Sequence, residues 1–129
     1  MSRLTRRTLC GLLGLGLIAV VAPVFAQTAV YDVEIKNRQV HGAPRTIRAN
    51  QNDTVVLRWR SDEAVRLHLH GYDIEISVEP SRVAEMTIAA RATGRFAIEA
   101  HGFGEAARAT ATPAGHGHTT LLYLEIHPR

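Results

Sequence analysis

The stretch Thr54-Val55-Val56-Leu57-Arg58-Trp59-Arg60 nearly alternates apolar and polar side chains, as does a strand with one face in a protein core. We therefore expect Trp59 in the core, and Arg58 and Arg60 on the opposite, solvent-facing side. Seven further segments show the same period of two: 30–35, 46–48, 64–70, 73–78, 83–88, 95–100 and 121–126. About eight short strands of this kind predict an all-β protein built as a β-sandwich.

Turn-forming residues separate these segments and give the sandwich its loops, at 37–44, 50–53, 61–63, 79–81 and 93–94. No segment has helical periodicity over enough residues to form a stable helix, and the sequence has neither an internal repeat nor an interdomain linker. The stretch 102–118 is rich in Ala and Gly and is predicted to be a long loop before the last strand. Loops of this length in a small domain often carry function.

Residues 1–26 have the composition of a cleaved export signal. Three arginines precede an apolar run over 9–21 that is short for a membrane span, and Val24-Phe25-Ala26 fits a signal peptidase site. Thr5-Arg6-Arg7-Thr8-Leu9 also resembles the twin-arginine signal of proteins that are exported already folded. Cys10 stands in front of the apolar run, which argues against a lipoprotein anchor. We expect one domain over 27–129, in the bacterial periplasm and without a membrane span.

Removal of this signal changes the charge and the redox chemistry of the chain. The formal net charge of +3 comes from the three signal arginines, so the remaining domain has 12 basic and 12 acidic residues. A nucleic-acid role then has no electrostatic basis. The only cysteine is also removed, so the exported domain offers neither a disulfide nor a thiolate ligand.

Histidines are the candidate functional residues, and all seven lie after the signal. In Leu67-His68-Leu69-His70-Gly71-Tyr72-Asp73, the two imidazoles are one residue apart, so they project from the same face of a strand about 7 Å apart. That spacing allows both to reach one metal ion. His101 follows the next-to-last predicted strand, and Gly115-His116-Gly117-His118 places two more imidazoles on flexible backbone before the last one.

These segments resemble the cupredoxins, in particular small periplasmic cupredoxin-like proteins. The resemblance covers the whole exported domain and rests on three stretches: 67–73, 92–102 and 122–126. It implies an eight-stranded Greek-key sandwich with one histidine ligand from an upstream strand and the others from around the loop before the last strand. His70, or His68, would supply the first ligand, and His101 with His116 or His118 would supply the rest.

The chain departs from the family pattern at the thiolate ligand. A blue-copper cupredoxin has the pattern aromatic-x-aliphatic-x-Cys in the next-to-last strand, whereas Phe96-Ala97-Ile98-Glu99-Ala100 ends in alanine. No methionine precedes the last strand to act as an axial ligand, and Met86 alternates with Ala84 and Ile88 as a core residue. A His₂Cys blue-copper centre with fast electron transfer is therefore excluded.

The remaining donors predict a metal site of imidazoles, with Glu99 or Glu105 as a carboxylate that could join it. Imidazole ligands suit copper or zinc, and copper is favoured by the order of affinities. The predicted function is copper binding, storage or transfer, with a periplasmic or membrane copper-handling protein as partner. The alternative is a metal-free cupredoxin-fold module that binds other proteins in the cell envelope. No serine, cysteine or glycine-rich motif of a known enzyme class is present, so no catalytic activity is predicted.

Overall fold

The computed structural model describes residues 25–108 and 118–129 of the 129-residue chain. The predicted signal, apart from its last two residues, and His116 lie outside this part. The described residues form one helical turn, α1 (Glu105–Arg108), and nine strands: β1 (Thr28–Lys36), β2 (Gln39–His41), β3 (Thr46–Asn50), β4 (Thr54–Ser61), β5 (Val65–Leu69), β6 (Ile74–Val78), β7 (Ala84–Ala89), β8 (Gly94–Phe103) and β9 (Thr119–His127). Among the described residues, no helix is long and apolar enough to cross a membrane.

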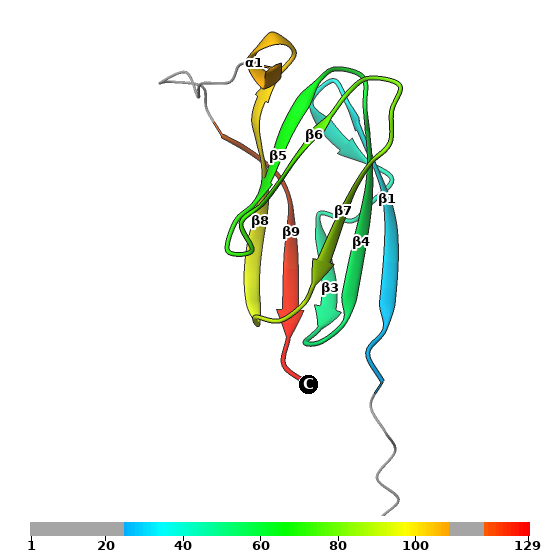
Figure 1. The fold of residues 1–129 in the computed structure, drawn as a ribbon, viewed down its shortest axis with the longest axis vertical. Coiled ribbons are helices and arrows are strands. Elements are labelled where there is room, and N and C mark those ends of the chain that lie inside the picture. Colours follow the sequence, from blue (N-terminus) through cyan, green and yellow to red (C-terminus); the bar gives the residue numbers. More distant parts are fainter. Residues whose placement is uncertain (1–24, 109–117) are drawn as a thin grey trace, which may run out of the picture.

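The strands form two sheets that pack as a sandwich (Figure 1). One sheet has the order β2-β1-β4-β7 and the other has the order β3-β9-β8-β5-β6. β1 pairs in parallel with β4, and β3 pairs in parallel with β9, while the other neighbours are antiparallel. The chain therefore crosses repeatedly between the sheets.

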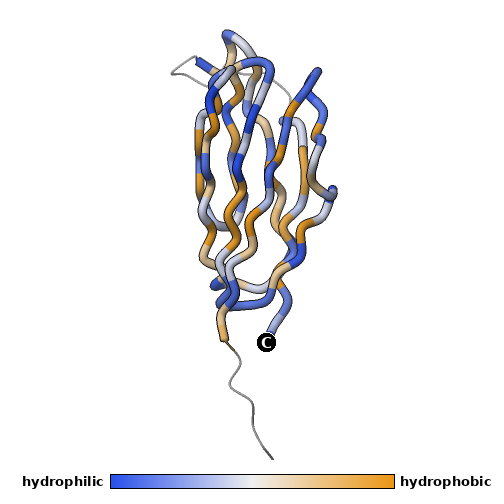
Figure 2. The backbone as a smooth tube through the Cα atoms, turned by 90° about the vertical axis from the view of Figure 1, so that its right-hand side faces the viewer, coloured by the Kyte–Doolittle hydropathy of each residue, from blue (hydrophilic) through white to orange (hydrophobic). Residues whose placement is uncertain are grey.

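The core between the sheets is built by the predicted alternation. Val55, Leu57 and Trp59 on β4 are fully buried, whereas Arg58 and Arg60 are exposed on the opposite face. Met86 is also a core residue, as predicted. Apolar and polar residues accordingly alternate along the tube in Figure 2. Burial of the apolar face is the main stabilising contribution, at roughly 25 cal/mol for each Å² removed from water.

All eight predicted strands are present, but the structure adds a ninth. β2 lies inside the stretch 37–44 that the sequence predicted to be a turn, because Asn37 and Arg38 alone connect it to β1. Both residues have positive φ, 50° and 62°, as the tightest hairpin turns require. Arg is rare in this conformation, which hid the hairpin in the sequence.

The first residues of the predicted loop over 102–118 belong to a strand and a helical turn. β8 continues to Phe103, and α1 follows at Glu105. Gly102 and Gly104 have positive φ, 127° and 58°, and turn the chain between the two elements. A Cβ at Gly102 would lie 3.0 Å from the carbonyl carbon of Ala106, so only glycine allows α1 to fold back this closely.

Candidate metal centre

The histidines of β5 and β8 lie on the outer face of the five-stranded sheet. Leu67 and Leu69 are fully buried in the core, so His68 between them points to the opposite face. The strand register places His68 beside Glu99 of β8, and Glu99 beside Thr120 of β9. These three residues form a row across neighbouring strands, on which the candidate site is built.

An irregularity between β8 and β9 brings β9 into this row. Ile98 is paired with Leu122 and Glu99 with Thr120, so Leu121 is an extra residue on β9. Leu121 and Leu122 are both buried, although neighbours in a regular strand would face opposite sides. The bulge thus reverses the alternation and turns Thr120 to the outer face, where it meets Glu99.

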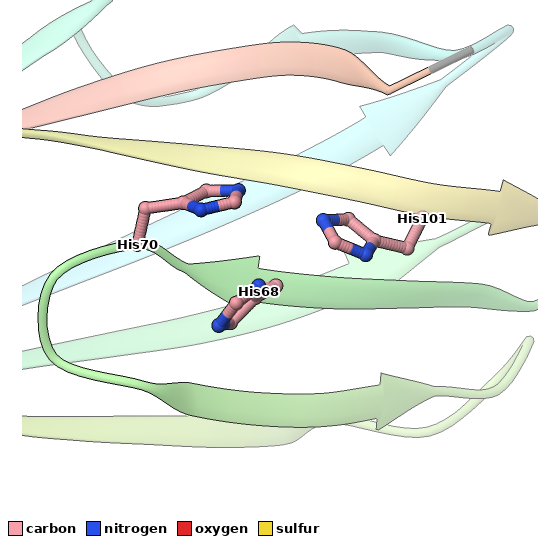
Figure 3. A group of neighbouring side chains, drawn as sticks. All are labelled: His68, His70 and His101. Atoms are coloured by element: carbon pink, nitrogen blue, oxygen red, sulfur yellow. The ribbon is translucent and has the colours of Figure 1, made fainter. Parts of the chain in front are cut away.

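Three imidazoles converge on this face. The ring centroids of His68 and His70 are 4.4 Å apart, and those of His101 lie 5.1 Å from His68 and 5.6 Å from His70. The rings of His70 and His101 point toward each other, and His68 lies beside them on β5 (Figure 3). One ligand atom from each residue lies within 4.8 Å of the others. We name these three residues the β5 set.

A second group of donors overlaps the first. Glu99, His101 and His118 also have ligand atoms that all lie within 4.8 Å of one another, and we name them the β9 set. The rings of His101 and His118 are 4.3 Å apart. A metal with bonds of about 2.0–2.2 Å to nitrogen or oxygen could be held by either set after small side-chain movements. His101 is the only member common to both sets.

His101 holds a buried donor atom that is available to a metal ion. Its side chain is only 14% exposed, and its buried Nε2 has no hydrogen-bond partner within residues 25–108 and 118–129. Burial lowers the pKa of His101 below its usual value, and the neighbouring imidazoles of His118, His68 and His70 lower it further. A neutral, buried imidazole nitrogen with no partner is costly unless it binds something, and a metal ion would satisfy it.

Glu99 links the two sets through its carboxylate. One oxygen, Oε2, lies 2.9 Å from Nε2 of His70 and 4.0 Å from Nε2 of His101, while Oε1 accepts a hydrogen bond from Thr120 at 3.1 Å. Burial opposes the ionisation of Glu99, but the hydrogen bonds from Thr120 and His70 outweigh it and hold the pKa of Glu99 below its usual value. Glu99 is therefore an anion within the cluster.

Carboxylates also orient His68 of β5 and His70, which directly follows that strand. An ionised carboxylate only accepts hydrogen bonds, so Nε2 of His70 carries the proton in its contact with Glu99. Nε2 of His68 lies 3.2 Å from Oδ1 of Asp73 in the turn after β5. Such contacts fix the tautomer and the ring orientation of histidines that bind metals.

The structure separates the predicted site residues into groups. It brings together His68, His70 and His101, and it adds His118 beside His101. His116 is outside the described residues, so its predicted role stays a prediction. Glu105 forms an ion pair with Arg108 in α1 and belongs to neither set, whereas Glu99 belongs to the β9 set.

Two residues of the site were not singled out from the sequence. Asp73 ends the quoted histidine stretch, but no period of two places it beside His68, because the turn at Gly71 intervenes. Thr120 faces Glu99 only because of the bulge. The one visible signal is the pair of adjacent apolar residues at 121–122, which interrupts the alternation of β9.

The position of the missing thiolate is on the other side of β8. Ala100 is 1% exposed in the core and is paired with buried Leu67, while Glu99 and His101 face outward. A side chain at position 100 would therefore point between the sheets. The imidazole cluster is separated from that position by the β8 backbone.

Comparison with known proteins shows which fold this is. The chain is similar to a multi-copper oxidase from Pseudomonas thermotolerans, with a TM-score of 0.57, 17% identity, and coverage of 81% of this chain and 31% of that one. It is also similar to the periplasmic domain of subunit II of cytochrome oxidase (CoxB) of Bradyrhizobium japonicum, with a TM-score of 0.53, 12% identity, and coverage of 77% and 83%. A third match is a copper nitrite reductase from Nitrosomonas europaea, with a TM-score of 0.50, 14% identity, and coverage of 79% and 42%.

These likenesses confirm the predicted cupredoxin-like β-sandwich. The chain spans about a third of the length of the multi-copper oxidase and most of the CoxB domain. No family model matches the chain, and no curated protein matches it. At such low identity, the likeness concerns the fold, and the function has to be argued from the site.

Proposed function

We propose that this protein binds one copper ion through imidazoles on the outer face of its five-stranded sheet and stores it or transfers it to another protein. The observation that carries the proposal is the convergence of His68 and His70 on His101, whose buried Nε2 has no hydrogen-bond partner in the part of the chain that the structure describes. His68 and His101 lie on two paired strands and His70 directly follows β5, so little conformational freedom is lost when a metal binds.

The donor set favours copper over other metals. Neutral imidazoles with one nearby carboxylate suit Cu(II) and Zn(II), and copper binds such sites more tightly than zinc does. The copper proteins among the structural neighbours add support through the shared fold. Zinc remains the second metal to test. Without a thiolate, the centre lacks the ligand that blue-copper sites use for electron transfer.

The proposed location is the periplasm, where the predicted export signal would deliver the protein. The similar CoxB domain is described as periplasmic, which agrees with this location. His70 is 44% exposed in its side chain, so the site opens to solvent and a copper-handling partner could approach it directly. An open sheet face suits exchange of the ion, and we propose a binding and delivery role and no enzymatic activity.

Titration of the purified protein with Cu(II) tests this function. Calorimetry and electron paramagnetic resonance should find one stoichiometric site. His101→Ala should weaken it more than about tenfold, since even losing a residue that only supports a ligand costs about 10–100-fold, and His70→Ala should weaken it by a smaller factor. His127→Ala is the matched control, because His127 lies on β9 and pairs with Glu125 at 3.1 Å, outside both sets. A protein that binds no copper or zinc would instead favour the metal-free, protein-binding module.

A further inference from the structure

We propose that the bound ion has two alternative coordination modes, one in the β5 set and one in the β9 set, and that it moves between them by pivoting on His101. This inference rests on the proposed function and deepens it. The ion would then move along the outer face of the sheet, over β8, without leaving the protein. It would pass from His68 and His70 at β5 to His118 at β9.

His101 makes the two modes alternatives instead of two separate sites. It is the only residue in both sets, and its buried Nε2 has no hydrogen-bond partner among the described residues. We take this Nε2 as the donor atom in both modes, and one nitrogen lone pair binds one metal ion at a time. The protein should therefore hold one ion per chain in either mode.

Glu99 is placed to exchange partners when the ion moves. In the β5 mode, Oε2 of Glu99 stays 2.9 Å from Nε2 of His70 and orients that ring. In the β9 mode, the carboxylate becomes a ligand beside His101, from whose Nε2 it is only 4.0 Å away. Thr120 holds the other oxygen at 3.1 Å, so Glu99 can change partners by a small movement about an anchored carboxylate.

His118 gives the β9 mode its contact with solvent. It immediately precedes β9 and is exposed, while its ring lies 4.3 Å from that of His101. His68 and His101 lie within the paired strands β5 and β8, whereas His118 directly precedes β9. The two modes thus differ in ligand type: three imidazoles in one, and two imidazoles with a carboxylate in the other.

Electron paramagnetic resonance of the purified protein with one equivalent of Cu(II) tests this inference. The wild type should show two overlapping Cu(II) spectra that together account for one ion per chain. His118→Ala should remove one spectrum and keep the other, and His68→Ala should have the reverse effect. His101→Ala should remove both. Glu99→Gln should also remove the β9 spectrum, while the β5 spectrum should persist with weaker binding because His70 loses its ionised partner.

The control variants are Glu125→Gln and His127→Ala, which change the same residue types on β9 outside both sets. Neither should alter the ratio of the two spectra. A single spectrum that is indifferent to His118→Ala and Glu99→Gln would overturn the two-mode inference while leaving copper binding intact. Two copper ions per chain would overturn it as well. Absence of any bound copper in the wild type would refute the proposed function itself.

Discussion

Gly71 directly follows His70 and illustrates how one residue shapes the site. Its φ is +81°, and an added Cβ would lie 2.5 Å from Cδ1 of Phe96. We predict that Gly71→Ala lowers the free energy of unfolding by about 1–2 kcal/mol through the backbone conformation. The clash with the Phe96 ring should cost a further ~1–3 kcal/mol. Urea unfolding followed by tryptophan fluorescence would measure the loss.

Gly104→Ala is the control for this prediction, because Gly104 has a φ of +58° but its Cβ would meet only Oε2 of Glu63 at 3.4 Å. This variant should show the backbone cost alone. Equal losses in the two variants would mean that the Phe96 ring moves aside without cost.

Thr120 offers a second prediction at the residue scale. Thr120→Val keeps the shape of the side chain but removes the hydrogen bond to Oε1 of Glu99, so the pKa of Glu99 should rise toward its usual value. Copper affinity should fall about tenfold, the lower end of the range for residues that support metal ligands. Carbon NMR titration of the Glu99 carboxyl and copper calorimetry would measure the two effects.

Thr119→Val changes the preceding, exposed residue and should leave both quantities unchanged. If Thr120→Val also leaves both unchanged, the hydroxyl does not hold Glu99.

At the scale of strands, the period of two predicted most of what the structure shows. It placed Trp59 in the core, and it placed His68 and His70 on one face. It could not reveal β2, whose two-residue turn depends on positive φ at Asn37 and Arg38. Nor could it show that Thr120 contacts Glu99. The bulge at Leu121 turns the β9 residues before it to the face opposite the one that regular alternation predicts.

The two faces of β8 lead to a further prediction. The resemblance to blue-copper proteins places their cysteine at Ala100, but this residue is buried in the core and faces away from the histidines. Ala100→Cys should therefore not give the intense blue colour of a copper–thiolate bond when Cu(II) is added. It should destabilise the fold by roughly 1 kcal/mol through overpacking.

Glu99→Cys is the matched variant, because position 99 faces the imidazoles. It should give a coloured copper–thiolate band, which absorption spectroscopy would detect. A blue Ala100→Cys protein would place the ion between the sheets and refute a site on the outer face.

For the whole molecule, the sequence predicted the sandwich but could not predict the order of its strands. That order follows from contacts between distant segments, such as the parallel pairing of β3 with β9. The strand order determines which side chains share a surface, and it places His68 of β5 next to His101 of β8. The histidine spacing indicated the donors, whereas only the sheet showed that they lie outside the sandwich.

Asp53 joins three distant parts of the chain and gives a prediction for the stability of the whole fold. Its carboxylate accepts hydrogen bonds from the backbone N–H groups of Gln27 and Asn50, each at 2.9 Å, and forms an ion pair with Arg129. The two backbone hydrogen bonds lower the pKa of Asp53 below its usual value, and Arg129 lowers it further. We predict that Asp53→Asn unfolds at lower urea concentration than the wild type at pH 7.

The pH dependence of this difference follows from the sign of the shift. The folded protein binds the proton of Asp53 less readily than the unfolded chain, so the ionised carboxylate stabilises the fold above the unfolded pKa of about 3.9. That contribution is lost as the pH falls through the lower, folded pKa. The difference in the free energy of unfolding between wild type and Asp53→Asn should therefore be largest at pH 7 and decrease steadily below about pH 4. If this difference in the free energy of unfolding stays constant down to pH 2.5, Asp53 acts through its shape and not through its charge. Asp32→Asn, which changes an exposed residue of β1, is the control, and its free energy of unfolding should differ little from that of the wild type at either pH.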